Sequence, residues 1–305
     1  MKLEVNEKRK AIIRIQTALL YKTRDFFCKR GFYELMPVIL SKCTDPLEPD
    51  RGSSVVKTGE IEYLGRKLKL TQSMILHKQL AISSGLDKIV IFSPNVRLEK
   101  PEKRFSGRHT FEFTQVDFEV VYARKEDIFR LIEDLTIEVW SWIKKTCKGD
   151  LEILARRLTV PEKPFKIYTT HEMVERYGEK WEIKASSSEK DPFWVICFKR
   201  EFYDKEDPSN PGHFLNYDLI YPEGYGEGLS GGERETDFGK LRSRINLIKR
   251  NRSDFDLYLK FARKHLLPSA GVGFGIERMV RYISGTPHIR DVQLFPRIPG
   301  EEIVF

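Results

Sequence analysis

The sequence predicts an α+β fold in which helices flank a mostly antiparallel sheet. Stretches of alternating apolar and polar residues are joined by short connections, as in hairpins, while helical patterns are gathered elsewhere in the chain. Near the C-terminus, Gly271, Gly273 and Gly275 occupy every second position of an apolar stretch. The pattern then switches to helical spacing, so a glycine strand is expected to run directly into a helix.

The N-terminal part predicts a long amphipathic helix followed by an edge strand. Isoleucine, leucine and phenylalanine recur on one side of residues 7–29, and Gly31 is expected to end that helix. Residues 32–37 form an extended segment with Pro37, which an edge strand tolerates. The later elements are expected as a hairpin at 60–70, strands at 88–98 and 111–122, a helix at 128–145, a small insertion at about 149–190, strands at 193–202 and 213–221, helices near 234–251 and 254–266, the glycine strand and a last helix.

Composition indicates a globular protein. The chain has 305 residues, of which 40% are hydrophobic and 32% are charged. No run of about twenty apolar residues occurs and the N-terminus is no signal peptide, so we expect no membrane segment and a cytoplasmic location. The four cysteines lie far apart, which favours reduced thiols over a zinc site.

The net charge of +8 suits an anionic partner such as a nucleotide or a nucleic acid. The 53 basic and 45 acidic residues are interleaved, however, and surfaces of this kind also occur in heat-adapted proteins. The charge alone therefore identifies no partner.

The glycine strand indicates a close approach by a ligand or by another backbone. Arg278 follows in the first turn of the next helix. The spacing fits neither a phosphate loop nor the dinucleotide-binding glycine pattern. Plain packing of the strand against a helix is the alternative.

Two neighbouring strands each present a polar face. Arg97 and Glu99 alternate with apolar residues on the first strand, and Gln115 and Asp117 do so on the second. A basic loop joins the strands, which suits a polyphosphate, while Phe113 offers a flat surface for an adenine. A solvated sheet face is the alternative.

These motifs resemble those of the class II aminoacyl-tRNA synthetases, and within that class the aspartyl/asparaginyl branch. The resemblance covers nearly the whole chain, as one catalytic domain at residues 1–305. The matching stretches are Gly31-Phe32-x-Glu34-x-x-Pro37, Gln72-Ser73-x-x-Leu76-x-Lys78-Gln79, Arg97-Leu98-Glu99, Arg108-His109-x-x-Glu112-Phe113, Asp218-Leu219-Ile220-x-Pro222, Gly231-x-x-Arg234-Glu235, Gly271-x-Gly273-x-Gly275-x-x-Arg278 and Ile289-Arg290-Asp291.

The resemblance implies a six-stranded antiparallel sheet that binds a bent ATP. Arg97 would hold the α-phosphate and the attacking carboxylate, and Arg278 would pair with the γ-phosphate. Arg278 would also stack on the adenine opposite Phe113. Arg108 and His109 would contact the terminal phosphates. Arg97 and Arg278 are therefore the expected catalytic residues.

The same resemblance implies a magnesium site and further nucleotide contacts. Glu227 and Asp218 would hold the ion, whose preference for oxygen ligands suits carboxylates and phosphates. Glu99 and Glu112 would contact the adenine or order the motif.

The implied amino-acid pocket contains two cations. Arg234 matches the arginine that pairs with the substrate side chain, and Lys78 matches a lysine of the aspartyl enzymes that the asparaginyl enzymes replace. Ser73, Gln115 and Asp117 would complete this pocket. Two cations favour the carboxylate of aspartate over an amide.

The chain departs from the family pattern at the residues that would bind the amino acid. We expect the chain to lack the anticodon-binding domain that in the family precedes the helix at residues 7–29; in addition, Ile75 replaces a glutamine, and the loop at residues 44–49 lacks the usual Thr-x-Glu-Gly. The resemblance is thus to a stand-alone paralogue of this branch that makes asparagine.

The expected function is therefore ATP-dependent synthesis of asparagine from aspartate and ammonia. The reaction would pass through β-aspartyl-AMP and release AMP and pyrophosphate, with no requirement for tRNA. We also expect a homodimer built on residues 31–37 and on the helix that precedes them. Two alternatives remain, namely a truncated synthetase that aminoacylates an RNA or a protein, and a non-catalytic regulator that binds aspartate or a nucleotide.

Overall fold

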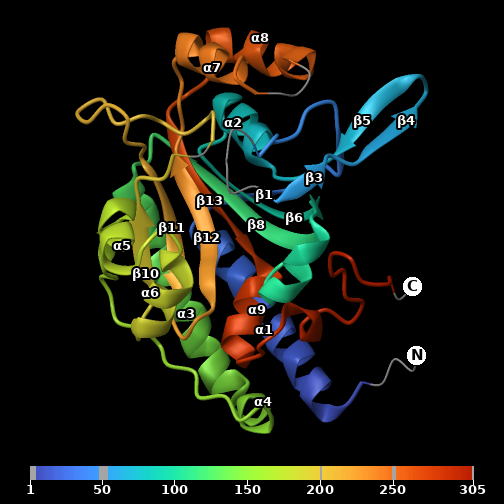
Figure 1. Cartoon of the computed structure of the whole chain (residues 1–305), viewed down its shortest axis with the longest axis vertical. Helices are drawn as coiled ribbons and strands as arrows, with labels where there is room; N and C mark the ends of the chain where they lie inside the picture. Colours follow the sequence, from blue (N-terminus) through green and yellow to red (C-terminus); the bar gives the residue numbers. More distant parts are fainter. Residues whose placement is uncertain (1–4, 48–53, 200, 249–251, 304–305) are drawn as a thin grey trace.

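A computed structural model describes residues 5–47, 54–199, 201–248 and 252–303, and it shows the expected α+β fold (Figure 1). The main sheet has eight strands in the order β1-β6-β8-β13-β12-β11-β10-β9. The expected number of six strands was wrong, because a short strand pairs with each edge. Both edge pairs, β1 with β6 and β9 with β10, are parallel, and all other neighbours are antiparallel.

The elements follow one another in a simple order. The strands of the main sheet are β1 (Tyr33–Leu35), β6 (Lys88–Val96), β8 (Glu112–Val121), β9 (Ile167–Thr169), β10 (Phe193–Ile196), β11 (Asn216–Tyr221), β12 (Gly226–Glu233) and β13 (Ser269–Gly275). The helices are α1 (Glu7–Lys29), α2 (Ile75–Ser83), α3 (Lys125–Thr146), α4 (Lys148–Ile153), α5 (Thr170–Tyr177), α6 (Trp181–Ser188), α7 (Phe238–Ile245), α8 (Asp256–His265) and α9 (Ile276–Ser284), with 3-10 turns at Pro101–Ser106, Arg252–Phe255 and Ile289–Asp291. Two small sheets contain β2 (Leu40–Ser41), β4 (Glu60–Tyr63) and β5 (Arg66–Leu70), and β3 (Val55–Lys57) with β7 (Leu98–Glu99).

Helices α1, α3 and α9 cover one face of the main sheet (Figure 1). Their apolar sides form the main core with Val116 and Phe118 of β8. Because side chains alternate along a strand, Gln115, Asp117 and Glu119 point to the opposite face. This opposite face carries the candidate site.

The glycines of β13 serve close packing between strands. A Cβ atom at Gly271 would lie 2.1 Å from the carbonyl oxygen of Phe118, and one at Gly273 would lie 2.1 Å from Nε2 of Gln115. Polar side chains of β8 therefore occupy the space that side chains of β13 would fill.

Several predicted elements are shorter in the structure. Strand β10 ends at Ile196, since Cys197 has a left-handed backbone conformation with φ of 71°. Helix α7 begins only at Phe238, where Asp237 caps it by accepting a hydrogen bond from the backbone N–H of Lys240. Arg234 precedes that helix and pairs with Asp204 in an isolated β-bridge. The end of the predicted helix, residues 249–251, lies outside the described residues.

The predicted insertion at residues 149–190 is built into the fold. It contributes the rest of α4, then β9, α5 and α6, and β9 pairs with β10 in the main sheet. The segment therefore completes one edge of the sheet.

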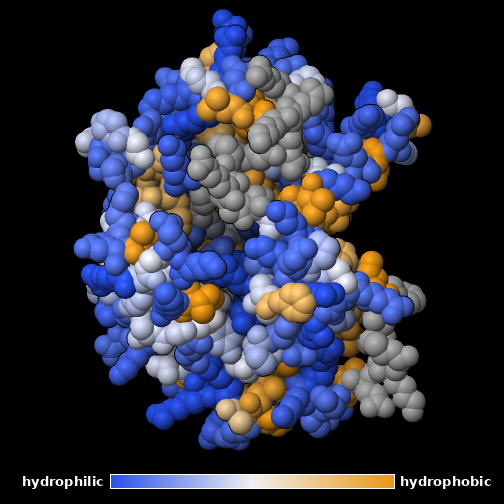
Figure 2. All heavy atoms as spheres, in the orientation of Figure 1, coloured by the Kyte–Doolittle hydropathy of each residue, from blue (hydrophilic) through white to orange (hydrophobic). Residues whose placement is uncertain are grey.

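The face shown in Figure 2 is mostly hydrophilic, with hydrophobic residues in small separate groups. Among the described residues, no helix combines the length and the hydrophobicity that crossing a bilayer requires.

Candidate active site

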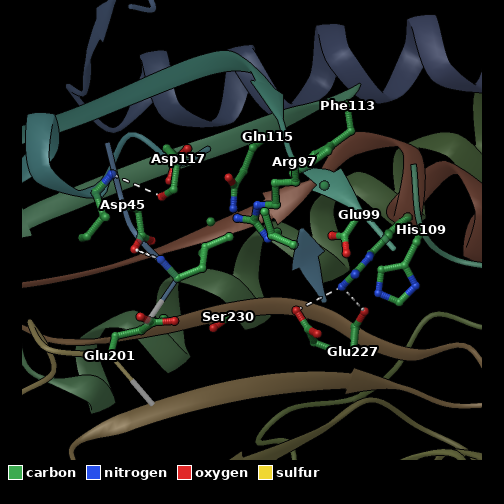
Figure 3. A pocket seen from close by; sticks show the side chains of 18 of the residues that line it. Asp45, Arg97, Glu99, His109, Phe113, Gln115, Asp117, Glu201, Glu227 and Ser230 are labelled. Carbon is green, nitrogen blue, oxygen red and sulfur yellow. Dashed lines mark hydrogen bonds and ion pairs between the residues drawn. The ribbon is translucent and has the colours of Figure 1, made fainter. Parts of the chain in front are cut away.

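A cavity of about 270 Å³ lies over the polar face of the main sheet. Strands β8, β12 and β13 form its floor, and the basic loop after β7 and the start of α9 contribute to one end. Figure 3 shows Asp45, Asp117 and Glu201 toward one end and Glu99 and Glu227 toward the other. We call the first the acidic end and the second the arginine end, since Arg108 and Arg278 line it.

At the arginine end, most residues implied by the synthetase motifs lie together. The guanidinium carbon of Arg97 lies 5.2 Å from the centre of the Phe113 ring. Arg278 donates from Nη1 to the carbonyl oxygen of Glu227 at 3.2 Å and lies 3.0 Å from its carboxylate. Two arginines from separate motifs therefore line one cavity with a flat aromatic ring, an arrangement that suits a nucleotide.

His109 lines the same end as a neutral side chain. Its Nδ1 lies 2.6 Å from the hydroxyl oxygen of Ser106. Burial, with the positive charges of Arg278, Arg108 and Lys103, lowers the pKa of His109 to about 2. Without a ligand, His109 is thus neutral at neutral pH, and its ring can offer a phosphate a hydrogen bond.

Glu99 lines the cavity and accepts a hydrogen bond from the hydroxyl of Ser54, whereas Glu112 does not line it. The Glu112 side chain is half exposed and lies 3.8 Å from Nε of Arg297. Neighbouring residues on a strand face opposite ways, and Phe113 faces the cavity. A contact of Glu112 with the adenine, or a role in ordering the motif, stays a prediction.

The residues that line the cavity include part of the magnesium site that the motifs imply. Glu227 and Ser230 both line the cavity, because a register shift adds Gly228 to β12 and brings residues three apart to one face. Asp218 is buried, pairs with Ser230 across β11 and β12, and is not among the residues that line the cavity, so its role as a magnesium ligand stays a prediction. No cluster of three metal-binding side chains occurs within the described ranges. A carboxylate and a hydroxyl fit a magnesium ion that phosphate oxygens also hold.

Toward the acidic end, Lys78 and Arg234 are buried and paired. Lys78 Nζ lies 2.9 Å from Asp117 Oδ1 and donates to the carbonyl oxygens of Val272 at 2.9 Å and Phe118 at 3.3 Å. Arg234 donates to both carboxylate oxygens of Glu119, at 2.8 and 3.1 Å. The two cations line the cavity, but carboxylates of the protein already balance their charge.

The remaining predicted residues of this pocket also line the cavity. Ser73, Gln115 and Asp117 are among them, as is Ile75, which offers an apolar surface there. Gln115 accepts a hydrogen bond from the side-chain amide of Asn95 at 2.6 Å. Oδ2 of Asp117 is buried without a hydrogen-bond partner, so it can accept one from a ligand.

The structure adds acidic residues that the sequence did not single out. Asp45, Glu201 and Asp204 line the acidic end, with Tyr203 beside them. Asp45 Oδ2 accepts a hydrogen bond from the Tyr203 hydroxyl at 2.8 Å, and burial raises the pKa of Asp45. In the sequence, the only signal for Asp45 was its place in the atypical loop at residues 44–49. Residues 48 and 49 of that loop lie outside the described residues.

Comparisons with known proteins agree with the site. The family described as tRNA synthetases class II (D, K and N) matches residues 1–299. The asparagine–tRNA ligase of Pyrococcus horikoshii is 31% identical over 96% of this chain and 69% of its own length. That of Pelotomaculum thermopropionicum is 32% identical over 95% of this chain and 70% of its own length.

Solved structures show the same relationship. The asparaginyl-tRNA synthetase of Pyrococcus horikoshii, in complex with asparaginyl-adenylate, has a TM-score of 0.86 at 28% identity and covers 97% of this chain and 70% of its own. An aspartyl-tRNA synthetase from Entamoeba histolytica has the same fold, with a TM-score of 0.75 at 24% identity, and covers 96% of this chain and 59% of its own. Since the motifs, the fold and the family match all agree, this chain belongs to the class II tRNA synthetases of the D, K and N group.

Proposed function

We propose that this chain is a ligase that activates aspartate with ATP as an acyl-adenylate and transfers it to ammonia, producing asparagine. The observation that carries the proposal is the pair of buried cations, Lys78 and Arg234, which line the same cavity as Arg97 and Arg278. A pocket with two cations suits a carboxylate, here the α-carboxylate of aspartate, which leaves the β-carboxylate free to attack ATP, while the body of the chain is similar to asparagine–tRNA ligases. Aspartate as substrate and asparagine as product are consistent with both facts.

Adenylation needs correct positioning and charge neutralisation, with no protein nucleophile. In this proposal Arg97 orients the α-phosphate and the attacking carboxylate, and Arg278 exchanges its contact with Glu227 for the γ-phosphate. Phe113 supports the adenine. A magnesium ion held by Glu227 and Ser230 would neutralise phosphate charge. An oxygen of the aspartate β-carboxylate forms a bond to the α-phosphorus, and pyrophosphate leaves.

For aspartate to bind, one contact that Lys78 or Arg234 makes with the protein would be exchanged for a contact with the substrate. Lys78 meets Asp117 and two carbonyl oxygens in the ligand-free arrangement, so the α-carboxylate must replace or share one of them. Nη1 of Arg234, which lies 4.0 Å from Asp204, is the second donor available to this carboxylate.

The acidic end supports ammonia as the acceptor. Glu201 and Asp204 line it beside Asp45, and their carboxylates would attract ammonium to a place close to the acyl-adenylate. After ammonium gives up a proton, the nitrogen bonds to the acyl carbon and AMP leaves with the electrons of the broken carbon–oxygen bond. A second proton returns to solvent and asparagine remains.

Transfer to tRNA is the second candidate. It is supported by the names of the relatives, which are asparagine–tRNA ligases, and on that ground the comparisons favour tRNA over ammonia. Both candidates share the adenylation step and differ in the acceptor. Magnesium, a homodimer and a cytoplasmic location stay predictions.

Amino-acid-dependent exchange of radioactive pyrophosphate into ATP tests the activation step. We expect aspartate to drive the exchange at least tenfold better than asparagine, with magnesium required. If asparagine drives it better, the proposed reading of Lys78 and Arg234 is wrong.

A further inference from the structure

Helix α6, in the segment first interpreted as a small insertion, is fastened to the turn between β11 and β12. The Ser186 hydroxyl donates to the carbonyl oxygen of Tyr221 at 2.6 Å and accepts from the backbone N–H of Gly226 at 3.0 Å. Since Glu227 follows directly, α6 has a fixed position beside the arginine end of the cavity.

Glu182 on this helix reaches two parts of that end. Its Oε1 accepts a hydrogen bond from the backbone N–H of Glu227 at 2.8 Å. Its carboxylate also forms a two-pronged ion pair with Nη1 and Nη2 of Arg108, the Nη2 contact being 3.1 Å. One carboxylate thus connects the basic loop to the strand that carries Glu227.

The backbone accommodates this ion pair closely. Gly226 has a φ of +76°, and a Cβ atom there would lie 2.5 Å from Glu182 Oε1 and 2.6 Å from Arg108 Nη1. The ion pair therefore lies directly against bare backbone, and only glycine leaves room for it.

We propose that Glu182 is a positioning residue for ATP, which holds Arg108 in place to receive the terminal phosphates. This inference rests on the proposed use of ATP. Arg108 lines the cavity while it is paired with Glu182, so the pair is compatible with a bound ligand. A guanidinium has five N–H donors, and the carboxylate engages two of them.

Pre-positioning matters because a long arginine side chain loses rotamer freedom when it binds a phosphate. Glu182 removes that freedom before ATP arrives. Loss of the carboxylate would also remove a negative charge that repels phosphate. The two effects act in opposite directions, and solvent screens the second in part, since the Glu182 side chain is 28% exposed, so the measured change in affinity is their net result.

Binding of a non-hydrolysable ATP analogue with magnesium, measured by titration calorimetry, tests the inference without any amino acid or acceptor. We expect Glu182→Ala to weaken binding about tenfold and Glu182→Gln, which keeps an acceptor oxygen, to weaken it about threefold. Glu179→Ala is the matched control, since it removes an exposed carboxylate three residues away and should bind like the wild type. The double variant Arg108→Ala/Glu182→Ala should bind no worse than Arg108→Ala alone.

Unchanged or tighter binding by Glu182→Ala would overturn the inference, as would a double variant clearly weaker than Arg108→Ala. If Glu182→Ala does not fold, the comparison of Glu182→Gln with Glu179→Ala decides in the same way. A wild-type protein that does not bind the analogue would instead overturn the proposed function, and this inference with it.

Discussion

Single residues on β8 show what strand alternation does for the site. Phe113, Gln115 and Asp117 face the cavity, while Val116 and Phe118 face the core. The sequence pattern predicted this division, and the same rule places Glu112 on the opposite side from Phe113. The motif resemblance gave Glu112 either a contact with the adenine or a role in ordering the motif, and its proximity to Arg297 is compatible with the second role.

The arginine end leads to a prediction about Arg278. Arg278→Ala should slow adenylation at least a hundredfold, because it removes a phosphate partner in the transition state. That loss corresponds to roughly 2.7 kcal/mol. Aspartate-dependent pyrophosphate exchange measures it. A variant with nearly wild-type exchange would show that the nucleotide binds elsewhere.

Glu277, next to Arg278, should make stability depend on pH. Its carboxylate accepts the backbone N–H of Thr114 at 2.9 and 3.1 Å, yet burial raises the pKa of Glu277 to about 7 from its ordinary 4.5. Between these values the unfolded chain releases the proton and the folded chain keeps it, so this group lowers stability as pH rises. Between pH 5 and pH 8, the free energy of unfolding of the wild type should therefore fall by about 2 kcal/mol more than that of Glu277→Gln.

Urea unfolding at pH 5, 6, 7 and 8 measures that difference. Glu62→Gln is the control, because it removes an exposed carboxyl of β4 that does not act on Glu277 and should follow the wild type. If the free energy of unfolding depends on pH in the same way for the wild type and for Glu277→Gln, the claim that burial raises the pKa of Glu277 is contradicted.

At the scale of elements, the glycine strand was predicted more completely than the sheet around it. The glycines at every second position correctly predicted that β13 lies close against a neighbour. The change to helical spacing predicted that β13 runs directly into α9. The edge strand β9 was not predicted, because its three residues are too few for a periodic signal, whereas β1 lies within the edge strand expected at residues 32–37. The acidic end was missed because its residues come mainly from loops, where no period identifies a face.

Two glycines of β13 should respond differently to alanine. At Gly271 the new methyl group would lie 2.1 Å from a backbone oxygen of β8, so the strands must separate, at a cost of about 3 kcal/mol. At Gly275 the nearest atom would lie 3.7 Å away, so the variant should unfold near the wild-type temperature. Equal melting temperatures for the two variants would contradict the packing role of Gly271.

At the scale of the whole molecule, the class and the family could be predicted from the sequence because several motifs occur in the expected order. The acceptor was predicted to be ammonia and stays a prediction, while the state of the amino-acid pocket could not be predicted, since it depends on how a few buried charges are paired. Lys78 and Arg234 were read as two available cations, whereas the structure pairs them with Asp117 and Glu119. Such pairing depends on three-dimensional neighbours that no sequence pattern contains.

The exposed edge of the main sheet leads to a prediction about assembly. Strand β1 lies at this edge, and the Met36 side chain that follows it is 87% exposed. We expect a homodimer across this edge, as the resemblance to class II synthetases implies, since a large exposed apolar side chain there suits an interface. Sedimentation at micromolar concentration should give the dimer mass, and Met36→Asp should give more monomer. A wild-type monomer would contradict this prediction.

The central claim is that the chain converts aspartate to asparagine through an adenylate. Its most direct test supplies purified protein with ATP, magnesium, aspartate and ammonium, with and without tRNA, and measures free asparagine, AMP and aspartyl-tRNA. The account predicts equal amounts of AMP and asparagine without tRNA, at a rate that rises with pH as ammonium deprotonates. Formation of aspartyl-tRNA without free asparagine would contradict the claim and establish tRNA as the acceptor.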